Sequence, residues 1–324
     1  MGFNNPALPW RELEAKLSGR RPPTGRGPGS PSWNAGGDGP AWGRKRQPYE
    51  PPSDGWHPTG AVPYAELHCH SNFSFLDGAS HPEALAEEAA RLGLETLALT
   101  DHDGLYGVVR FAEAASAVGL ATVFGAEITL ADGTAPGRRA RTEEQTDRQR
   151  GRTNTPPVPQ PDPHGEHLLV LADGPDGYAA LSRALSLGHL AGEKGAPRFA
   201  LDDLADAGRG NWWVLTGCRK GTVPAALLRD GPAAAERELH RLMDAFGADR
   251  IAVELWDHGD PLDSHRNDAL AQLGVRNGLT VVATNNVHYA TPSERLLATS
   301  LAAVRARRSL DELDPWLPAS AGAH

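Results

Sequence analysis

The chain has 324 residues, enough for one large domain or two ordinary ones. Its formal net charge of −9 excludes a chain that is basic throughout, so contact with DNA would require a local positive patch or a metal cluster. Two cysteines exclude a disulfide framework, and the lack of a membrane-length apolar run or a signal-peptide core predicts a cytoplasmic protein with no membrane partner.

Residues 1–60 are rich in Gly, Pro, Arg and Trp and form a predicted N-terminal arm. One short helical pattern, at 10–17, precedes a Gly- and Pro-rich stretch that cannot bury enough apolar surface to offset its ordering entropy. We therefore expect a mostly disordered arm. Because exposed Trp is uncommon, we expect the tryptophans of this segment to dock, and the domain that follows is the favoured docking surface.

From residue 61, short apolar runs alternate with helical patterns. Strands are predicted over 61–70, 96–100, 121–124, 167–172, 211–216, 251–255 and 280–284, and helices after a capping box at 80–83 and over 108–118, 178–189, 233–246, 264–276 and 292–307. Residues 132–165 lack an apolar period and predict a disordered insertion loop. The alternation, of about seven units, predicts a parallel α/β barrel over 61–291. A doubly wound open sheet is the alternative.

The first strand ends in Leu67-His68-Cys69-His70, and Asp77 follows on the next loop. Side chains two residues apart on a strand share a face, so His68 and His70 should point the same way and Cys69 away from them. Two adjacent imidazoles and a carboxylate suit a divalent metal. The two histidines alone are equally compatible with a structural pair.

Further potential ligands lie where the other predicted strands end, the edge that carries the site in such barrels, except that His167 opens its predicted strand. Nine groups exceed what one metal needs and suit two or three metals about 3.5–4 Å apart, the arrangement used for phosphoester hydrolysis through a metal-bound water. Histidine and carboxylate ligands favour Zn or Mn, and the one cysteine favours Zn. The nine are His68, His70, Asp77, His102, Glu127, His167, Cys218, Asn286 and His288.

Two other carboxylates adjoin these positions. Asp101 precedes His102 and would face the opposite way on a strand, so we expect it to position a loop or a ligand and not to bind metal. Glu254 also ends a strand, and its position fits a site residue and a plain barrel-end carboxylate equally well. No catalytic side chain is predicted beyond the metal-bound water.

The motifs H-C-H, F-L-D-G-A-S, T-D-H-D-G-L-Y-G, F-G-A-E, H-L-L-V-L-A, L-T-G-C-R-K-G and A-T-N-N-V-H-Y resemble the successive motifs of a PHP domain (polymerase and histidinol phosphatase). They are most similar to the N-terminal region of bacterial C-family polymerases (DNA polymerase III alpha-like), in the error-prone branch. This resemblance implies a distorted seven-stranded, TIM-like (β/α)7 barrel with a cluster of two or three metals.

By the same resemblance, the metal ligands would be His68, His70, Asp77, His102, Glu127, His167, Cys218 and His288. One position departs from the family pattern. The last motif usually ends Asp-x-His, whereas here it reads Asn286-Val287-His288. A neutral amide is a poorer ligand than a carboxylate and cannot act as a base, so Asn286 is expected to be at most a weak ligand. This departure bears on hydrolysis more than on the fold.

Three functions follow as hypotheses. The first is the PHP portion of an error-prone DNA polymerase in replication, damage-tolerant synthesis and repair, with 3′–5′ exonuclease or phosphoesterase activity. Its candidate partners are DNA, through the parent polymerase, and other damage-tolerance proteins. Residues 292–324 would then hold a helix and the start of a linker to a polymerase module, and this chain would not polymerise DNA alone. The alternatives are a free-standing phosphoesterase for a small ester and a non-catalytic, metal-stabilised scaffold.

Overall fold

The computed structural model describes residues 63–130, 166–306, 309–310 and 323–324. The predicted arm over 1–60 and the predicted insertion over 132–165 lie outside these residues, as does most of the segment that follows residue 306. The predictions made for those segments therefore stay predictions.

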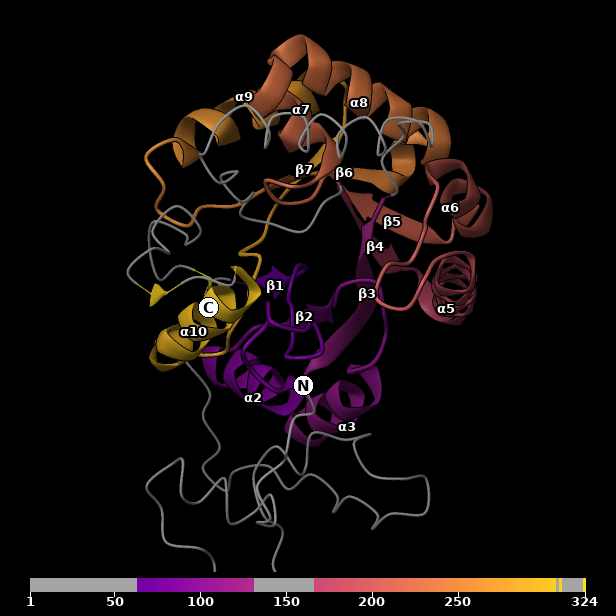
Figure 1. The fold of residues 1–324 in the computed structure, drawn as a ribbon. Coiled ribbons are helices and arrows are strands. Elements are labelled where there is room, and N and C mark those ends of the chain that lie inside the picture. Colours follow the sequence, from indigo (N-terminus) through magenta and orange to yellow (C-terminus); the bar gives the residue numbers. More distant parts are fainter. Residues whose placement is uncertain (1–62, 131–165, 307–308, 311–322) are drawn as a thin grey trace, which may run out of the picture. The chain divides into compact units, whose positions relative to one another are not determined.

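Seven strands form one sheet in which the order in space equals the order in sequence (Figure 1). The two edges of this sheet meet, because the His70 N–H donates to the Val287 carbonyl and the Val287 N–H to the His68 carbonyl, both at 2.8 Å. The predicted barrel is confirmed, and the open doubly wound sheet is excluded. The strands are β1 (Ala65–Glu66), β2 (Thr96–Leu99), β3 (Ala121–Thr129), β4 (His167–Ala172), β5 (Trp212–Leu215), β6 (Ile251–Leu255) and β7 (Thr280–Ala283).

Strand β4 shows that the expectation of a parallel sheet was wrong at one strand. It runs antiparallel to both β3 and β5, whereas the other neighbouring pairs are parallel. Antiparallel pairing puts Thr129, at the end of β3, opposite His167, at the start of β4. A parallel crossover would have carried His167 to the far end of the barrel. The reversal explains how a residue that opens its strand lies beside residues that close theirs.

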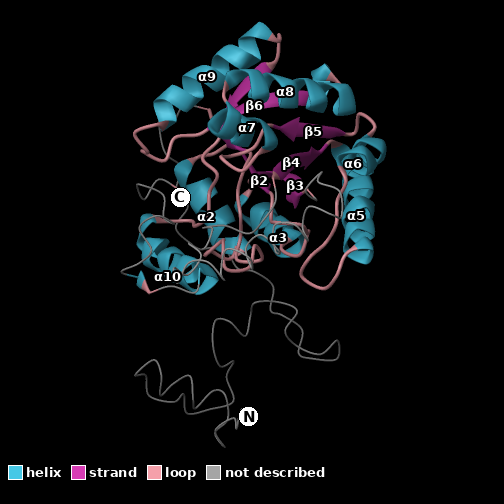
Figure 2. Cartoon of the chain, turned by 45° about the horizontal axis from the view of Figure 1, so that its top comes forward, coloured by secondary structure: helices cyan, strands magenta, loops and turns pink. Residues whose placement is uncertain are grey.

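Helices cover the outside of the strands (Figure 2). The capping box expected at Ser80 is wrong: His81 is the N-cap and makes no capping bond, while the Ser80 hydroxyl donates to Glu294 Oε2 at 2.5 Å. Two short helices, α6 (Leu201–Gly208) and α7 (Thr222–Asp230), were not anticipated. The helices are α2 (Pro82–Leu92), α3 (Val108–Val118), α5 (Gly174–Ala191), α6 (Leu201–Gly208), α7 (Thr222–Asp230), α8 (Pro232–Phe246), α9 (Asp263–Arg276) and α10 (Arg295–Ala306), with 3-10 turns η2 (Ala248–Arg250) and η3 (Pro292–Glu294).

The core has an outer and an inner layer, and β4 contributes to both. Leu168 and Val170 belong to the large cluster shared with the helices, whereas Leu169 and Leu171 belong to a smaller cluster with residues of β2, β5 and β6. Burial on both faces explains why this strand is a continuous apolar run. No described helix is both long and apolar enough to cross a membrane.

Candidate metal centre

The two histidines of the first motif share one side of the chain, as predicted. His68 and His70 are fully buried, and their Nε2 atoms lie 3.1 Å apart. Cys69 between them is also buried and lines a separate cavity together with Leu85 and Leu97. Two ring nitrogens at this distance require either a shared proton or a cation between them.

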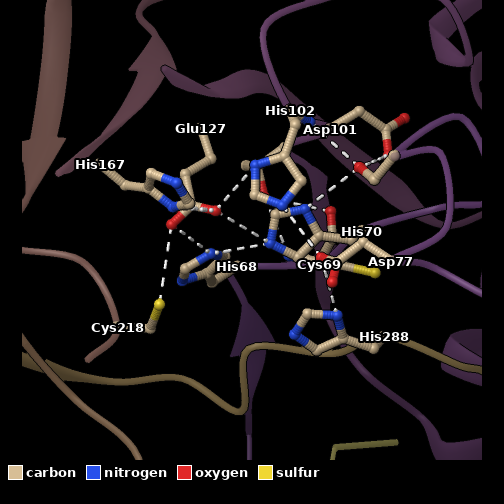
Figure 3. Close-up of polar contacts among 12 residues, drawn as sticks. His68, Cys69, His70, Asp77, Asp101, His102, Glu127, His167, Cys218 and His288 are labelled. Atoms are coloured by element: carbon tan, nitrogen blue, oxygen red, sulfur yellow. Dashed lines mark hydrogen bonds and ion pairs between the residues drawn. The ribbon is translucent and has the colours of Figure 1, made fainter. Parts of the chain in front are cut away.

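Glu127 on β3 lies at the centre of the cluster (Figure 3). Its Oε1 is 3.5 Å from His68 Nε2, and its Oε2 is 3.5 Å from His70 Nε2. The same Oε2 is 3.2 Å from His102 Nδ1 and 3.1 Å from His167 Nδ1. One buried carboxylate therefore faces four imidazoles that come from different parts of the chain.

Asp77 forms a second focus on the loop after β1. Its Oδ2 lies 3.0 Å from His102 Nε2 and 3.2 Å from His288 Nδ1. Its other oxygen, Oδ1, contacts the guanidinium of Arg305 on α10. The imidazole of His102 thus has one nitrogen facing Glu127 and the other facing Asp77, and it links the two carboxylates.

All eight predicted ligands lie in this cluster or against it. Cys218 Sγ lies 3.7 Å from Glu127 Oε1, and His288 packs against the His70 ring with centroids 4.9 Å apart. The potential ligand atoms form three overlapping groups, each within 4.8 Å. The groups are His68, His70 and Glu127; His70, Asp77 and His102; and His102, Glu127 and His167.

Divalent metal ions fit this set of donors. His167 Nδ1 is buried and has no hydrogen-bond partner among the described residues, although a carboxylate oxygen lies 3.1 Å away. Buried polar atoms are normally satisfied, so an orphaned imidazole nitrogen aimed at a carboxylate suits coordination. The donors are imidazoles and carboxylates, with one thiol nearby, the types that Zn and Mn accept.

Comparison with known proteins identifies the family of the chain. The model of the PHP domain matches residues 66–258 of the chain. The chain belongs to the PHP domain family. It is 52% identical over 326 residues to the error-prone DNA polymerase of Mycobacterium bovis, 50% identical over 349 residues to that of Nocardia farcinica and 48% identical over 326 residues to that of Cutibacterium acnes. These alignments cover 98–100% of this chain but only 26–30% of each relative.

Solved structures of similar fold are more distant in sequence. A candidate metal-dependent phosphoesterase from Bifidobacterium adolescentis is 17% identical with a TM-score of 0.45, and the match covers 74% of this chain and 89% of the other. An amidohydrolase from Chromobacterium violaceum is 20% identical with a TM-score of 0.44, covering 69% and 87%.

Nearby imidazoles of this PHP domain hold the carboxylates of Glu127 and Asp77 ionised. Burial alone would raise the pKa of Glu127, but His167 and His102 outweigh it and hold that pKa well below its ordinary value. His288 and His102 do the same for Asp77. Burial and the nearby His102 lower the pKa of His70, which keeps its imidazole neutral. Burial opposes the charged form of His68 and His102 as well, but the charges of Glu254 and Glu127 raise the pKa of His68, and the hydrogen bond to Asp77 raises that of His102 to about 9. Metal binding would therefore have to displace protons from these two imidazoles.

Asp101 lies where a positioning residue of the PHP domain would be expected. Its carboxylate accepts hydrogen bonds from the Ser71 N–H, the Ser71 hydroxyl and the Ser74 hydroxyl, each at 2.7 Å. Ser74 Oγ in turn accepts from the His102 N–H at 3.1 Å and lies 3.3 Å from His70 Nδ1. Asp101 thus ties the loop that carries Asp77 to the strand end that carries His102.

Glu254 of β6 is the residue whose role the sequence left undecided. It is fully buried, and its Oε1 lies 2.7 Å from His68 Nδ1 and accepts from the Thr284 hydroxyl at 2.5 Å. A carboxylate behind a histidine fixes the ring so that its other nitrogen faces the metal. Alternation along β6 could have predicted that Glu254 faces inward, because side chains two residues apart share a face and Ala252 belongs to the inner core layer.

No sequence pattern pointed to Arg305, which reaches Asp77 from beyond the region matched by the PHP model. Asn286 is 8% exposed, has a φ of 44°, and its Oδ1 lacks a hydrogen-bond partner among the described residues. Its expected weak ligation stays a prediction.

Proposed function

We propose that this chain is the PHP domain of an error-prone DNA polymerase and that it binds two or three divalent metal ions, Zn or Mn, to hydrolyse phosphodiesters at the end of a nucleic-acid strand. The observation that carries the proposal is the convergence of imidazoles and carboxylates in three overlapping groups, each spanning no more than 4.8 Å. The proposed ligands are His68, His70, Asp77, His102, Glu127, His167, Cys218 and His288.

The shape of the cluster supports more than one metal. Glu127 presents one oxygen to His68 and the other to His102 and His167, so both of its oxygens would help to hold metal. His102 presents one nitrogen to Glu127 and the other to Asp77, which connects the two carboxylate foci. When bound, neighbouring divalent ions neutralise phosphate charge and lower the pKa of a water near them.

The protein itself orients the ligands and leaves one side open. Glu254 accepts from His68 Nδ1, so that His68 Nε2 faces the cluster, and Asp101 holds the Asp77 loop in place. The side chains of His68 and His70 are fully buried, whereas those of His102 and His288 are 25% and 23% exposed. A phosphate would therefore approach on the side of His102, Asp77 and His288.

The choice of a nucleic-acid substrate rests on the relatives, whose names describe DNA polymerases. DNA, through the parent polymerase, and other damage-tolerance proteins are the partners we propose, in translesion synthesis and repair. A second function has one observation in its favour. Asn286 is a neutral amide where the family pattern has a carboxylate, and it cannot act as a base, which favours a metal-stabilised scaffold that does not hydrolyse phosphodiesters.

The test combines elemental analysis of the purified chain with hydrolysis assays in Mn and in Zn. Substrates are an end-labelled single-stranded oligonucleotide and a small phosphomonoester. We expect bound metal and shortening of the oligonucleotide, both lost in His68→Ala and His102→Ala and kept in His240→Ala, an exposed histidine on α8. Bound metal without hydrolysis would favour the scaffold, and hydrolysis of the small ester alone would favour a free-standing phosphoesterase.

A further inference from the structure

A tight turn beside the candidate metal centre exposes an aromatic side chain. The Asp77 N–H donates to the Ser74 carbonyl at 2.9 Å, so residues 74–77 form a β-turn. Phe75 takes the second position of this turn and is 84% exposed. Leu76 takes the third position with a φ of 61°, a backbone conformation that favours glycine.

Both features of this turn are unfavourable by themselves. A leucine in the left-handed region is strained, and a phenylalanine side chain exposed to water contributes no hydrophobic stabilisation to the fold. The surrounding structure nevertheless maintains the turn, since the Ser74 hydroxyl donates to buried Asp101 at 2.7 Å. Strain of this kind concentrates at binding and catalytic sites, where the conformation itself is needed.

The turn is attached to the open side of the centre at both of its ends. At one end, Ser74 Oγ accepts from the His102 N–H and lies 3.3 Å from His70 Nδ1. At the other end, Asp77 Oδ2 lies 3.0 Å from His102 Nε2. Phe75 therefore lies between two residues, Ser74 and Asp77, that contact the open side of the centre.

A positive charge lies on the other side of the same carboxylate. Arg305 contacts Asp77 Oδ1, and its side chain is 24% exposed. A guanidinium offers several N–H donors in a planar fork and binds phosphate oxygens with good geometry. An exposed aromatic residue two positions from Asp77 and a cation in contact with Asp77 thus accompany the centre, and these are the two kinds of group with which proteins hold a single strand of nucleic acid.

We propose that Phe75 stacks on the base of the terminal nucleotide while Arg305 binds an adjacent phosphate, so that an unpaired strand end is the preferred substrate. The proposal rests on the proposed function for the position of the reacting phosphate. Stacking uses the face of the base, so it tolerates every sequence, but it requires a base free of its partner strand.

Binding of short single-stranded oligonucleotides to the metal-loaded chain tests this, measured by fluorescence anisotropy with the dye on the far end. Two oligonucleotides are compared, one complete and one lacking its terminal base. Phe75→Ala should weaken binding of the complete oligonucleotide about 5- to 100-fold and leave the abasic one unchanged, and Phe75→Trp should restore it. Val275→Ala on α9, 74% exposed and preceding β7 at the other end of the barrel, is the matched control.

The effect of Arg305→Ala should not depend on the terminal base. The substitution should weaken binding of both oligonucleotides alike and reduce the salt dependence by about one phosphate contact. If wild type binds both oligonucleotides equally, or binds neither, the stacking proposal is wrong. Hydrolysis measured on the same samples separates the two proposals. Base-dependent binding without hydrolysis would refute only the hydrolytic function, and hydrolysis with an unchanged KM in Phe75→Ala would refute only the stacking.

Discussion

Replacing Glu254 by glutamine should weaken metal binding without unfolding the barrel. Glu254 does not lie on the side of the centre where a phosphate would approach. It is fully buried behind His68, with its Oε1 2.7 Å from His68 Nδ1. Glutamine has nearly the same shape and can still accept from the Thr284 hydroxyl, which donates to Oε1. It lacks the negative charge that strengthens the bond to the His68 ring.

The magnitude follows from this bond. A hydrogen bond to a charged group contributes about 1.5–3 kcal/mol, and each 1.4 kcal/mol is about tenfold in an equilibrium constant. Loss of part of this energy should lower metal affinity by about 10- to 100-fold, the usual cost of removing the partner of a metal-bound histidine. Substitution by alanine would add a cavity and would mix this effect with lost packing.

The assay is competition for Zn or Mn with a chromophoric chelator, with thermal unfolding of the metal-free protein in parallel. Asp263→Asn is the matched control, since Asp263 is also a buried carboxylate but pairs with Arg266, 2.7 Å away. We expect Asp263→Asn to lower the Tm while leaving metal affinity as in wild type. Wild-type metal affinity in Glu254→Gln would refute the role of Glu254 in orienting His68.

Three further outcomes are expected. Chelation should lower the Tm and excess metal restore it, because metal at about 100 times its Kd stabilises the native state by about 2.7 kcal/mol; a Tm indifferent to chelator would contradict metal binding. In the chelated protein, burial opposes the charged form of His102, but the hydrogen bond that its ring donates to Asp77 and the charge of Glu127 raise its pKa from 6.5 to about 9. The contribution of His102 to the free energy of unfolding should therefore be present below pH 6.5 and be lost between pH 6.5 and about 9. Urea titrations at several pH values measure this, and a His102→Gln variant that loses the same stability over this pH range would refute it. Gly78→Ala should lower the free energy of unfolding by about 1–3 kcal/mol and reduce metal content, since a β-carbon there would collide with the backbone of Ser71. The control is Gly278→Ala, where φ is 67° and an added β-carbon would meet no other part of the described structure within 4 Å, and this variant should retain metal.

Part of the candidate site was predictable because it depends on local geometry. Alternation along an extended chain put His68 and His70 on one side and Cys69 on the other, and the structure agrees. The carboxyl ends of parallel strands meet at one end of a barrel, so His102 could be placed near this pair before the fold was known. These inferences need only strand periodicity and the order of elements.

The rest of the candidate site could not be predicted from the sequence, because it depends on contacts between distant segments. Whether Glu254 faces the site depends on β6 packing behind His68, a contact between residues 186 positions apart. Arg305 reaches Asp77 across 228 positions, from a helix that carries no motif. The exposure of Phe75 follows from a turn held by Asp101, and an apolar residue in F-S-F-L-D gives no sign of being in solvent.

The sequence by itself determined the barrel class, the metal-type donor set and the family, because these follow from periodicity, residue chemistry and motif wording. Only the tertiary structure decided the direction of β4, which brings His167 to the same end as the other ligands. It also decided which carboxylates face the imidazoles of the cluster and which lie behind them, and which side of the cluster is open. Those properties are set by packing and burial between strands far apart in the chain, and no local pattern encodes them.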